Sequence, residues 1–250
     1  METRPLRVLS YNIHGQAHLL DRRYLERIAR VISDVKPDVV GLQEVHRGGW
    51  KARSADQTAE LGRLTGMTAV FGPSFEVRGG AFGNAVLTSG RLLESGVVPL
   101  TAPGEPRTLL TARIAFADLR FDGSRFDGLR FDGINEIAFH VTHLAAWGRW
   151  GRSARSLQST ALLERLKQSN GPFVLVGDLN AVPGAPELKP LMTGEVFRMC
   201  GDAKLCTHRF LRQRIDYVFA DPGWTPVTER VVQTGPSDHW PVLVELQRSS

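Results

Sequence analysis

Six short segments of the chain each end a predicted strand on a residue that can bind a metal or carry a proton: residues 11–15, 42–45, 141–144, 177–180, 214–217 and 237–241. Between them they supply carboxylates, side-chain amides and strand-end histidines. Mg²⁺ takes oxygen ligands, keeps several waters and needs one or two carboxylates. Together, the segments predict one hard-cation site of the kind that hydrolyses a phosphate ester.

Asp178 and Asn180 give the clearest signal among these residues. They follow an apolar run, residues 173–177, that predicts a fully buried strand. Their side chains face the same side of an extended chain. An acceptor for a water proton would then lie beside an amide that can donate to a phosphate. A turn that ends the strand through the Asp178 side chain is the alternative. His143 likewise ends a β-branched strand.

The residues at the other predicted strand ends give a weaker signal when each is considered alone. Glu44 and Asn12 follow apolar strands, but a solvated charge and a turn residue explain them equally simply. Asp238 and His239 stand side by side before a core strand, and Asp216 offers another buried acid. An Asp–His pair would fix the imidazole tautomer and favour imidazolium, a donor to the charge that develops on a phosphorane.

Composition sets broad limits on the partners and the location. The net charge is +5 and the pI is about 9.6, which favours nucleic acid, phosphate metabolites or an acidic membrane surface. Ordinary solubility charge explains the same values. Cys200 and Cys206 are too few for a disulfide framework, and we expect reduced thiols, with a single local bridge as the alternative. His208 alone does not complete a zinc site with them. Without a long apolar stretch, we expect a cytoplasmic protein with no stable membrane association. The sequence does not determine the oligomeric state, for which a monomer is the favoured hypothesis.

Strands outnumber helices in the predicted order of elements. Helices are expected over residues 21–35, 54–64 and 153–168, with Asp21 and Ser54 as the first two caps. Many neighbouring strands lack a helix between them, which favours antiparallel or mixed sheets with helices outside. Since no segment resembles a linker, residues 1–250 are expected to form one domain.

Residues 119–133 are a tandem five-residue repeat that ends each unit on Arg-Phe-Asp-Gly. An odd spacing would turn successive Phe side chains to alternate faces of a strand, and Asp-Gly favours turns. We therefore expect a hairpin insertion around 119–133. A calcium-binding repeat is the alternative, for which three spaced Asp residues are poor evidence.

The motifs, in this order along the chain, resemble the endonuclease/exonuclease/phosphatase superfamily. The resemblance runs from residue 8 to about residue 244 and suggests a small bacterial-type member with the deoxyribonuclease-like fold. That fold is α/β: a four-layer sandwich of two packed mixed or antiparallel sheets flanked by helices. The resemblance also implies an active site at one end of the sandwich and a Mg²⁺ or Mn²⁺ cofactor.

Roles for the strand-end residues follow from this resemblance. Glu44 would be the principal metal ligand, with Asn12 and Asp238 beside the metal. The remaining side chains would act on the phosphate or on the attacking water: Asp178, Asn180, His239, Asp216 and His143. Asp178 would position or deprotonate the water, Asn180 would hold a phosphate oxygen, and Asp216 would orient His239 against the scissile phosphate.

Four further residues are candidates for substrate contact. Asn84 lies in a family segment near the site, and Arg107 lies where nucleases of this fold often touch substrate. Trp147 and Arg149 belong to a loop whose aromatic and basic side chains could stack bases and meet phosphates. A turn residue, a surface arginine, a packed tryptophan and a solvated helix face are the respective alternatives.

The segment around Asp216 narrows the substrate class. It is Arg-Ile-Asp-Tyr, which resembles nucleases and small bacterial members rather than the Trp-Cys-Asp-Arg of inositol phosphatases. The leading hypothesis is therefore a metal-dependent phosphodiesterase that acts on DNA or RNA by in-line water attack. A hydrolase of small phosphate esters or phospholipid headgroups is the alternative. An inactive binding scaffold is disfavoured because all the expected catalytic residues are present.

Overall fold

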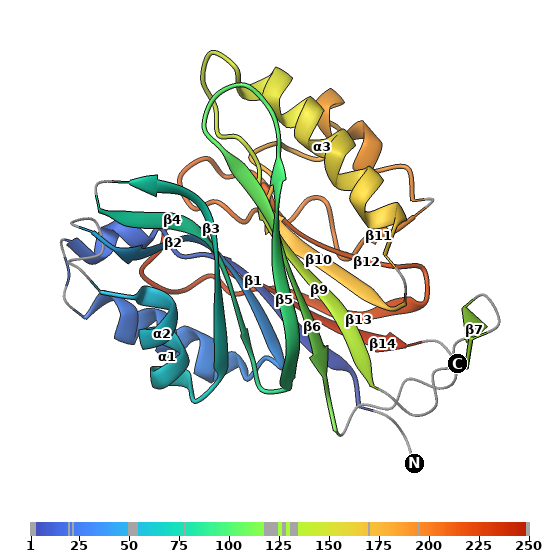
Figure 1. Cartoon of the computed structure of the whole chain (residues 1–250), viewed down its shortest axis with the longest axis horizontal. Coiled ribbons are helices and arrows are strands. Elements are labelled where there is room, and N and C mark those ends of the chain that lie inside the picture. Colours follow the sequence, from blue (N-terminus) through green and yellow to red (C-terminus); the bar gives the residue numbers. More distant parts are fainter. Residues whose placement is uncertain are drawn as a thin grey trace.

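The computed structural model of the chain describes residues 4–19, 21, 23–49, 55–77, 79–117, 125–126, 129–130, 135–169, 171–194 and 196–248. Two six-stranded sheets pack against each other at its centre (Figure 1). The first has the order β13 (Trp224–Val231), β14 (Val242–Arg248), β1 (Leu6–Asn12), β2 (Val39–Gly48), β4 (Gly80–Thr88) and β3 (Thr68–Val77). The second has the order β11 (Arg198–Met199), β12 (Asp216–Ala220), β10 (Phe173–Asp178), β9 (Glu136–His143), β6 (Arg107–Ala115) and β5 (Arg91–Leu100).

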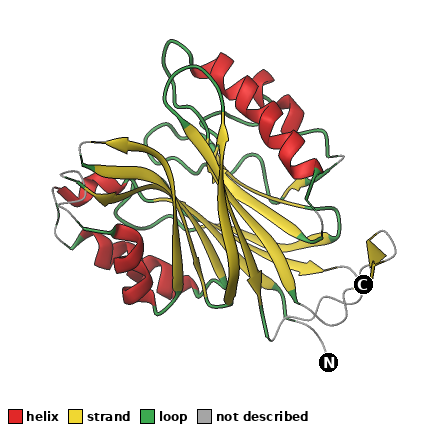
Figure 2. Ribbon diagram, in the orientation of Figure 1, coloured by secondary structure: helices red, strands yellow, loops and turns green. Residues whose placement is uncertain are grey.

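Helices cover the outer face of each sheet, as Figure 2 shows. α1 (Tyr24–Val35) and α2 (Gln57–Thr65) pack on the first sheet, and α3 (Gly151–Lys167) with the 3-10 helix η3 (Pro186–Leu191) packs on the second. Another 3-10 helix, η1, spans Gly15–Leu19. One apolar core lies between the sheets and one lies under each helical layer. The predicted four-layer α/β sandwich is therefore confirmed.

The sheets approach closely where β2 crosses the second sheet. A Cβ added to Gly41 would overlap a methyl group of Val176 and would lie 2.9 Å from Cγ2 of Val141. Both valines belong to strands of the opposite sheet. A glycine at this position therefore lets β2 sit directly against β9 and β10.

The helix starts differ from the prediction. α1 begins at Tyr24, and the Asp21 carboxylate accepts a hydrogen bond from the Arg23 N–H at 2.9 Å instead of capping the helix. α2 begins at Gln57 with Asp56 as its cap, since the Asp56 side chain accepts from the Ala59 N–H at 3.0 Å. Ser54, the predicted cap, lies outside the described residues.

Strand pairing brings the predicted site residues to one edge of the two sheets. β1 runs parallel to β2, with Asn12 opposite Gln43. β10 runs parallel to β9 and antiparallel to β12, and Asp178 lies opposite His143 on one side and Asp216 on the other. Because parallel strands end at the same edge, their carboxyl-terminal residues gather there.

The predicted hairpin insertion falls mostly outside the described residues. Of it, β7 (Arg125–Phe126) and β8 (Leu129–Arg130) pair antiparallel. The flanking strands β6 and β9 are antiparallel neighbours in the second sheet, as a hairpin connection requires. Among the described helices, none is both long and apolar enough to span a membrane.

Candidate active site

Asn12 connects the acids of the two sheets. Its Nδ2 lies 3.3 Å from Oε1 of Glu44 and 3.0 Å from Oδ2 of Asp178. Its Oδ1 accepts the His14 backbone N–H at 3.0 Å. The His14 N–H can only donate, so the oxygen end of the amide is fixed and the NH₂ end must face the two carboxylates. Asn12 therefore holds Glu44 and Asp178 at one place.

Three residues of this region adopt left-handed backbone conformations: His14 at φ 45°, Glu44 at φ 59° and Asn180 at φ 50°. At Glu44 the pairing of β2 with β4 shifts register between Leu42 and Val45. A bulge of this kind redirects a side chain within a strand, and β2 resumes its pairing with β4 from Val45 to Gly48. Such conformations cost on the order of 1–3 kcal/mol for non-glycine residues and concentrate at functional sites.

His239 and Asp216 form a buried pair. Nδ1 of His239 lies 2.9 Å and 3.1 Å from the two carboxylate oxygens of Asp216. Its Nε2 lies 3.7 Å from Oδ2 of Asp178. Burial alone would lower the pKa of His239, but the charges of Asp216 and Asp178 outweigh it and raise the pKa to about 10. The surrounding carboxylates therefore favour the imidazolium form of His239, and its Nε2 faces Asp178.

Asp178 lies deep in the site and is almost completely buried. Burial, with the nearby Asp216 charge, raises the pKa of Asp178 above its usual range. Its Oδ1 accepts the Asn180 backbone N–H at 2.8 Å. A carboxylate with a raised pKa is suited to accept a proton near neutral pH.

His143 is neutral and supports Asn180. Nδ2 of Asn180 lies 2.9 Å from Nε2 of His143 and 3.2 Å from the Leu144 carbonyl oxygen. Burial, with the charges of Arg107 and His239, holds the pKa of His143 well below its usual range. Since the amide NH₂ donates, Nε2 of His143 is the acceptor. His143 thus orients the Asn180 amide.

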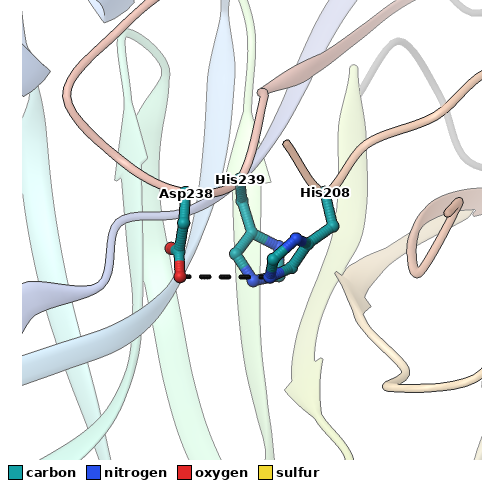
Figure 3. A group of neighbouring side chains, drawn as sticks. All are labelled: His208, Asp238 and His239. Carbon is teal, nitrogen blue, oxygen red and sulfur yellow. Dashed lines mark ion pairs between the residues drawn. The ribbon is translucent and has the colours of Figure 1, made fainter. Parts of the chain in front are cut away.

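Asp238 lies between two further histidines. One carboxylate oxygen is 3.2 Å from Nδ1 of His14, and the other is 3.9 Å from Nε2 of His208 (Figure 3). Burial alone would raise the pKa of Asp238. The hydrogen bond and charge of His14, together with the charge of His239, outweigh burial and lower the pKa to about 2. Asp238 is therefore ionised at any physiological pH.

These residues surround a cleft of about 480 Å³. Its lining includes the predicted residues Glu44, Arg107, His143, Trp147, Asp178, Asn180, Asp238 and His239. A second cleft of about 500 Å³ shares Trp147 and Asn180 with the first and continues along residues 181–187. The Trp147 indole N–H donates to the Asn180 carbonyl oxygen at 2.8 Å. Because Trp147 lines both clefts, its side chain lies where they meet.

Arg107 is a buried cation in the cleft. Its side chain is 4% exposed, and its Nη2 pairs with Glu105 at 2.7 Å. Within the described residues, its Nε and Nη1 make no hydrogen bond although both are buried. Unsatisfied buried donors are costly, which favours an anionic ligand at this position.

Two predicted contact residues lie elsewhere. Asn84 is buried behind the cleft, and its Nδ2 lies 3.4 Å from the Thr108 carbonyl oxygen of the other sheet. Arg149 does not line either cleft, and its guanidinium lies 5.2 Å from the centre of the Trp150 ring. Asn12 is likewise absent from the lining, because it lies beneath the two acids that it bonds.

His14 and His208 are two histidines of the site that the sequence did not assign. His14 follows the first strand by two residues, a position that carries a weak signal. His208 lies in a loop far from any strand end in the sequence, and no pattern marks it. Only the folding of that loop onto residues 238–240 brings it to the cleft.

The donors of the site suit a divalent cation. Two groups have ligand atoms within 4.8 Å of one another: His208 with Asp238 and His239, and Asp178 with Asp216 and His239. Neither group contains Glu44, the principal ligand that the resemblance implies. Glu44 and Asp238 nevertheless both face the cleft, and carboxylate oxygens are the ligands that Mg²⁺ and Mn²⁺ prefer.

A sequence model of the Endonuclease/Exonuclease/phosphatase family matches residues 9–239 of the chain. A comparison with curated proteins finds no match. The matched range begins in the middle of β1 and includes every predicted site residue from Asn12 to His239.

Solved structures share the fold over nearly the whole chain. The endonuclease/exonuclease/phosphatase from Beutenbergia cavernae DSM 12333 is 25% identical with a TM-score of 0.77, over 99% of this chain and 72% of that one. A mannosyl-6-phosphatase from Bacteroides thetaiotaomicron VPI-5482 is 20% identical with a TM-score of 0.72, over 97% and 99%. D. rerio TDP2 complexed with single strand DNA product is 18% identical with a TM-score of 0.70, over 97% and 98%.

Proposed function

Because the chain belongs to the endonuclease/exonuclease/phosphatase family, we propose that it is a Mg²⁺- or Mn²⁺-dependent phosphodiesterase that acts on nucleic acid. Members of this family hydrolyse phosphoric esters and generally depend on a divalent metal. The observation that carries the proposal is the meeting of Glu44, Asp178 and His239, which are remote in sequence, around the Asn12 amide and one cleft.

Glu44 and Asp238 would hold the cation. Both are carboxylates that face the cleft, and Asp238 is ionised throughout the physiological range. Asn12 would orient Glu44 and Asp178, because its own oxygen is bonded to the His14 N–H. When bound, the cation supplies positive charge that stabilises the phosphate oxygens in the transition state.

Three side chains of the protein would act on the attacking water and on the phosphate. Asp178 accepts a proton from the attacking water, which its raised pKa favours. His239, an imidazolium oriented by Asp216, donates through Nε2–H to a phosphate oxygen. Asn180 donates to another phosphate oxygen once its amide leaves His143, and attack proceeds in line without a covalent intermediate.

The nucleic-acid substrate is supported by the second cleft. A substrate with its scissile phosphate beside Asp178 could continue past Trp147 into that cleft, where a base would stack on the exposed indole. The net charge of +5 favours a polyanion. D. rerio TDP2, which shares the fold, is solved with a DNA product.

A hydrolase of small phosphate esters is the second candidate. The buried, partly unpaired guanidinium of Arg107 suits a terminal phosphate, which has more free oxygens than a diester. The mannosyl-6-phosphatase of the same fold is a precedent for such a substrate. Phospholipid headgroups belong to the same class.

We also propose one domain over residues 1–250, since both sheets share a core, and a cytoplasmic monomer. Cys200 and Cys206 are free thiols, in agreement with a reducing compartment. The repeat over 119–133 is then an insertion between β6 and β9.

A metal-dependent hydrolysis panel tests the proposed function. It contains plain and abasic duplex DNA, single-stranded DNA, RNA, an artificial phosphodiester, inositol phosphates, sugar phosphates and sphingomyelin. We expect nucleic acid to be cleaved with Mg²⁺ or Mn²⁺ and not in chelator, with KM rising steeply with salt. Turnover of monoesters alone, with little salt dependence, would assign the second candidate instead.

The panel needs two isosteric variants. Asp178→Asn removes the proposed base, and we expect a loss of about 10²–10⁴-fold in kcat. Asp34→Asn makes the same change on the exposed face of α1 and should leave kcat unchanged. Equal turnover by both variants would identify a contaminating hydrolase.

A further inference from the structure

The loop that carries His208 is fixed onto the strand-end segment that carries His239. The Trp240 N–H donates to the Thr207 carbonyl oxygen at 2.6 Å, and the Arg209 N–H donates to the Asp238 carbonyl oxygen at 2.8 Å. His208 and His239 form an antiparallel bridge. The two imidazoles are consequently neighbours (Figure 3). Their ring centres are 4.6 Å apart, and the rings meet edge to face at 66°.

The same loop determines the tautomer of His208. Two backbone N–H groups, those of Phe210 and Leu211, donate to Nδ1 of His208 at 3.2 Å and 3.1 Å. A backbone N–H can only donate, so Nδ1 must present a lone pair. The proton of the neutral ring is then on Nε2. An imidazolium would place a third N–H against these two donors, which the arrangement disfavours.

This tautomer argues against His208 as a metal ligand. A ligating histidine binds through one lone pair and donates its other ring N–H to an acceptor. His208 has the reverse arrangement: its lone pair faces the loop, and its N–H faces the cleft. Its nearness to Asp238 and His239 therefore does not by itself make a metal site.

The Nε2–H of His208 also lacks a partner at hydrogen-bond distance on Asp238. The separation from the Asp238 carboxylate oxygen is 3.9 Å, beyond the length of a hydrogen bond. The side chain is 13% exposed and lines the cleft. A donor of fixed direction is thus available to a ligand beside His239.

We propose that His208 donates its Nε2–H to a nonbridging oxygen of the substrate phosphate and remains neutral throughout. This inference rests on the proposed function and adds a phosphate-binding residue to it. His208 transfers no proton and binds no metal. Its two loop hydrogen bonds preorganise the donor, so no reorientation is needed when the phosphate arrives.

The tautomer can be measured without any substrate. Long-range ¹H–¹⁵N NMR of histidine-labelled protein distinguishes the protonated ring nitrogen from the unprotonated one, and His208→Gln identifies the signal that belongs to His208. We expect a neutral ring with the proton on Nε2 at pH 7. A proton on Nδ1, or a doubly protonated ring, would overturn the inference.

The donor role is tested by titrating inorganic phosphate into the Mn²⁺-loaded protein. His208→Ala should weaken phosphate binding by about 10–100-fold, the usual range for a hydrogen bond to a charged group. His208→Gln carries an N–H near the position of Nε2 and should restore most of the affinity. Mn²⁺ affinity, measured separately by calorimetry, should stay within about twofold in both variants.

Each other outcome contradicts the inference. Weaker Mn²⁺ binding by His208→Ala would make His208 a ligand, and unchanged phosphate binding would make it a bystander. No phosphate binding by the wild type, or no rescue by His208→Gln, would also reject the donor role. Failure of the proposed function is separate, because it would appear as absent ester turnover in a protein whose phosphate titration still depends on His208.

Discussion

Asn12 shows how a single amide can determine an active site. Its oxygen is fixed by the His14 N–H, so its NH₂ group must face Glu44 and Asp178. Those two acids belong to strands of different sheets, β2 and β10. The Asn12 amide offsets part of the repulsion between the Glu44 and Asp178 carboxylates. Asn12 therefore reduces the cost of holding them together for a cation and a water.

The pKa of His239 depends on the carboxylate behind it. Asp216 contributes the largest of the three charges, ahead of Asp178 and Asp238, that raise this pKa to about 10 against the effect of burial. In Asp216→Asn, burial should prevail and the titration midpoint should fall below 10, because the imidazolium loses its strongest partner. The measurement is a ¹⁵N NMR titration of metal-free protein. An unchanged midpoint would show that Asp216 does not hold the proton on His239; Asp34→Asn is the control.

Trp147 is expected to contact a polymer but not a small diester. Removal of a stacking platform costs about 1–3 kcal/mol per base, so Trp147→Ala should raise KM for single-stranded DNA about 10-fold or more. KM for an artificial phosphodiester should stay nearly constant. Trp150→Ala is the matched control, since Trp150 is similarly exposed, at 51% against 56%, and lines neither cleft. Equal effects of both changes on both substrates would argue against stacking.

At the scale of elements, β2 serves both the core and the site. Near its start Gly41 packs against the opposite sheet, and in its middle a bulge and a left-handed backbone turn Glu44 into the cleft. The position of the carboxylate therefore depends on how closely the sheets pack. Changes at Gly41 should affect stability first and metal binding second.

Gly41→Ala tests this close packing. The new methyl group would overlap Val176, whose branched side chain cannot move away easily, so we expect a loss of about 1–3 kcal/mol in the free energy of unfolding. Chemical denaturation measures it. Gly96→Ala, on the exposed strand β5, meets no atom within 4 Å and should be neutral. If both variants are equally stable, the sheets are farther apart than described.

Strand ends could be predicted from the sequence because strands obey local patterns. An apolar run followed by an acid correctly placed Asp178 at the end of β10 without any knowledge of sheet order. The same pattern was misleading for the other two acids, since Glu44 lies within β2, which continues to Gly48, and Asp216 begins β12. Helix starts were less predictable. Asp21 and Asp56 are both plausible caps, and which carboxylate reaches a free N–H is decided by loop geometry that no periodicity records.

In the molecule as a whole, long-range contacts limit what can be predicted from the sequence. His208 contributes to the cleft because its loop hydrogen-bonds to a segment 30 residues further along the chain, and no local pattern encodes that contact. Asn84 shows the opposite case. Its sequence position suggested substrate contact, but it donates across the sheets to Thr108 and lies behind the cleft. Only the packed sandwich distinguishes these positions.

Stability should depend on a buried histidine remote from the cleft. His140 lies in β9 under the second helical layer, with its Nδ1 2.9 Å from Oγ1 of Thr111. Burial lowers its pKa from 6.5 to about 4. Between these values the unfolded chain binds more protons than the folded one. The stability that neutral His140 contributes is therefore present above about pH 6.5 and is lost as pH falls toward 4.

The size of this effect is on the order of 2 kcal/mol between pH 7 and pH 4.5. His140→Phe should flatten the pH dependence of the unfolding free energy by that amount, as measured by urea denaturation at each pH. Thr111→Val keeps the ionisable ring buried and should preserve the slope. A slope that is the same in wild type and His140→Phe would show that this ring does not titrate as burial predicts.

If residues remote in sequence meet around one divalent cation, anomalous diffraction from crystals grown with Mn²⁺ should locate that cation in the cleft. We expect one strong anomalous peak there, in direct contact with a carboxylate oxygen of Glu44 and close to Asp238. A peak ligated by His208 and His239 without Glu44, or the absence of any peak in the cleft at saturating Mn²⁺, would contradict this expectation.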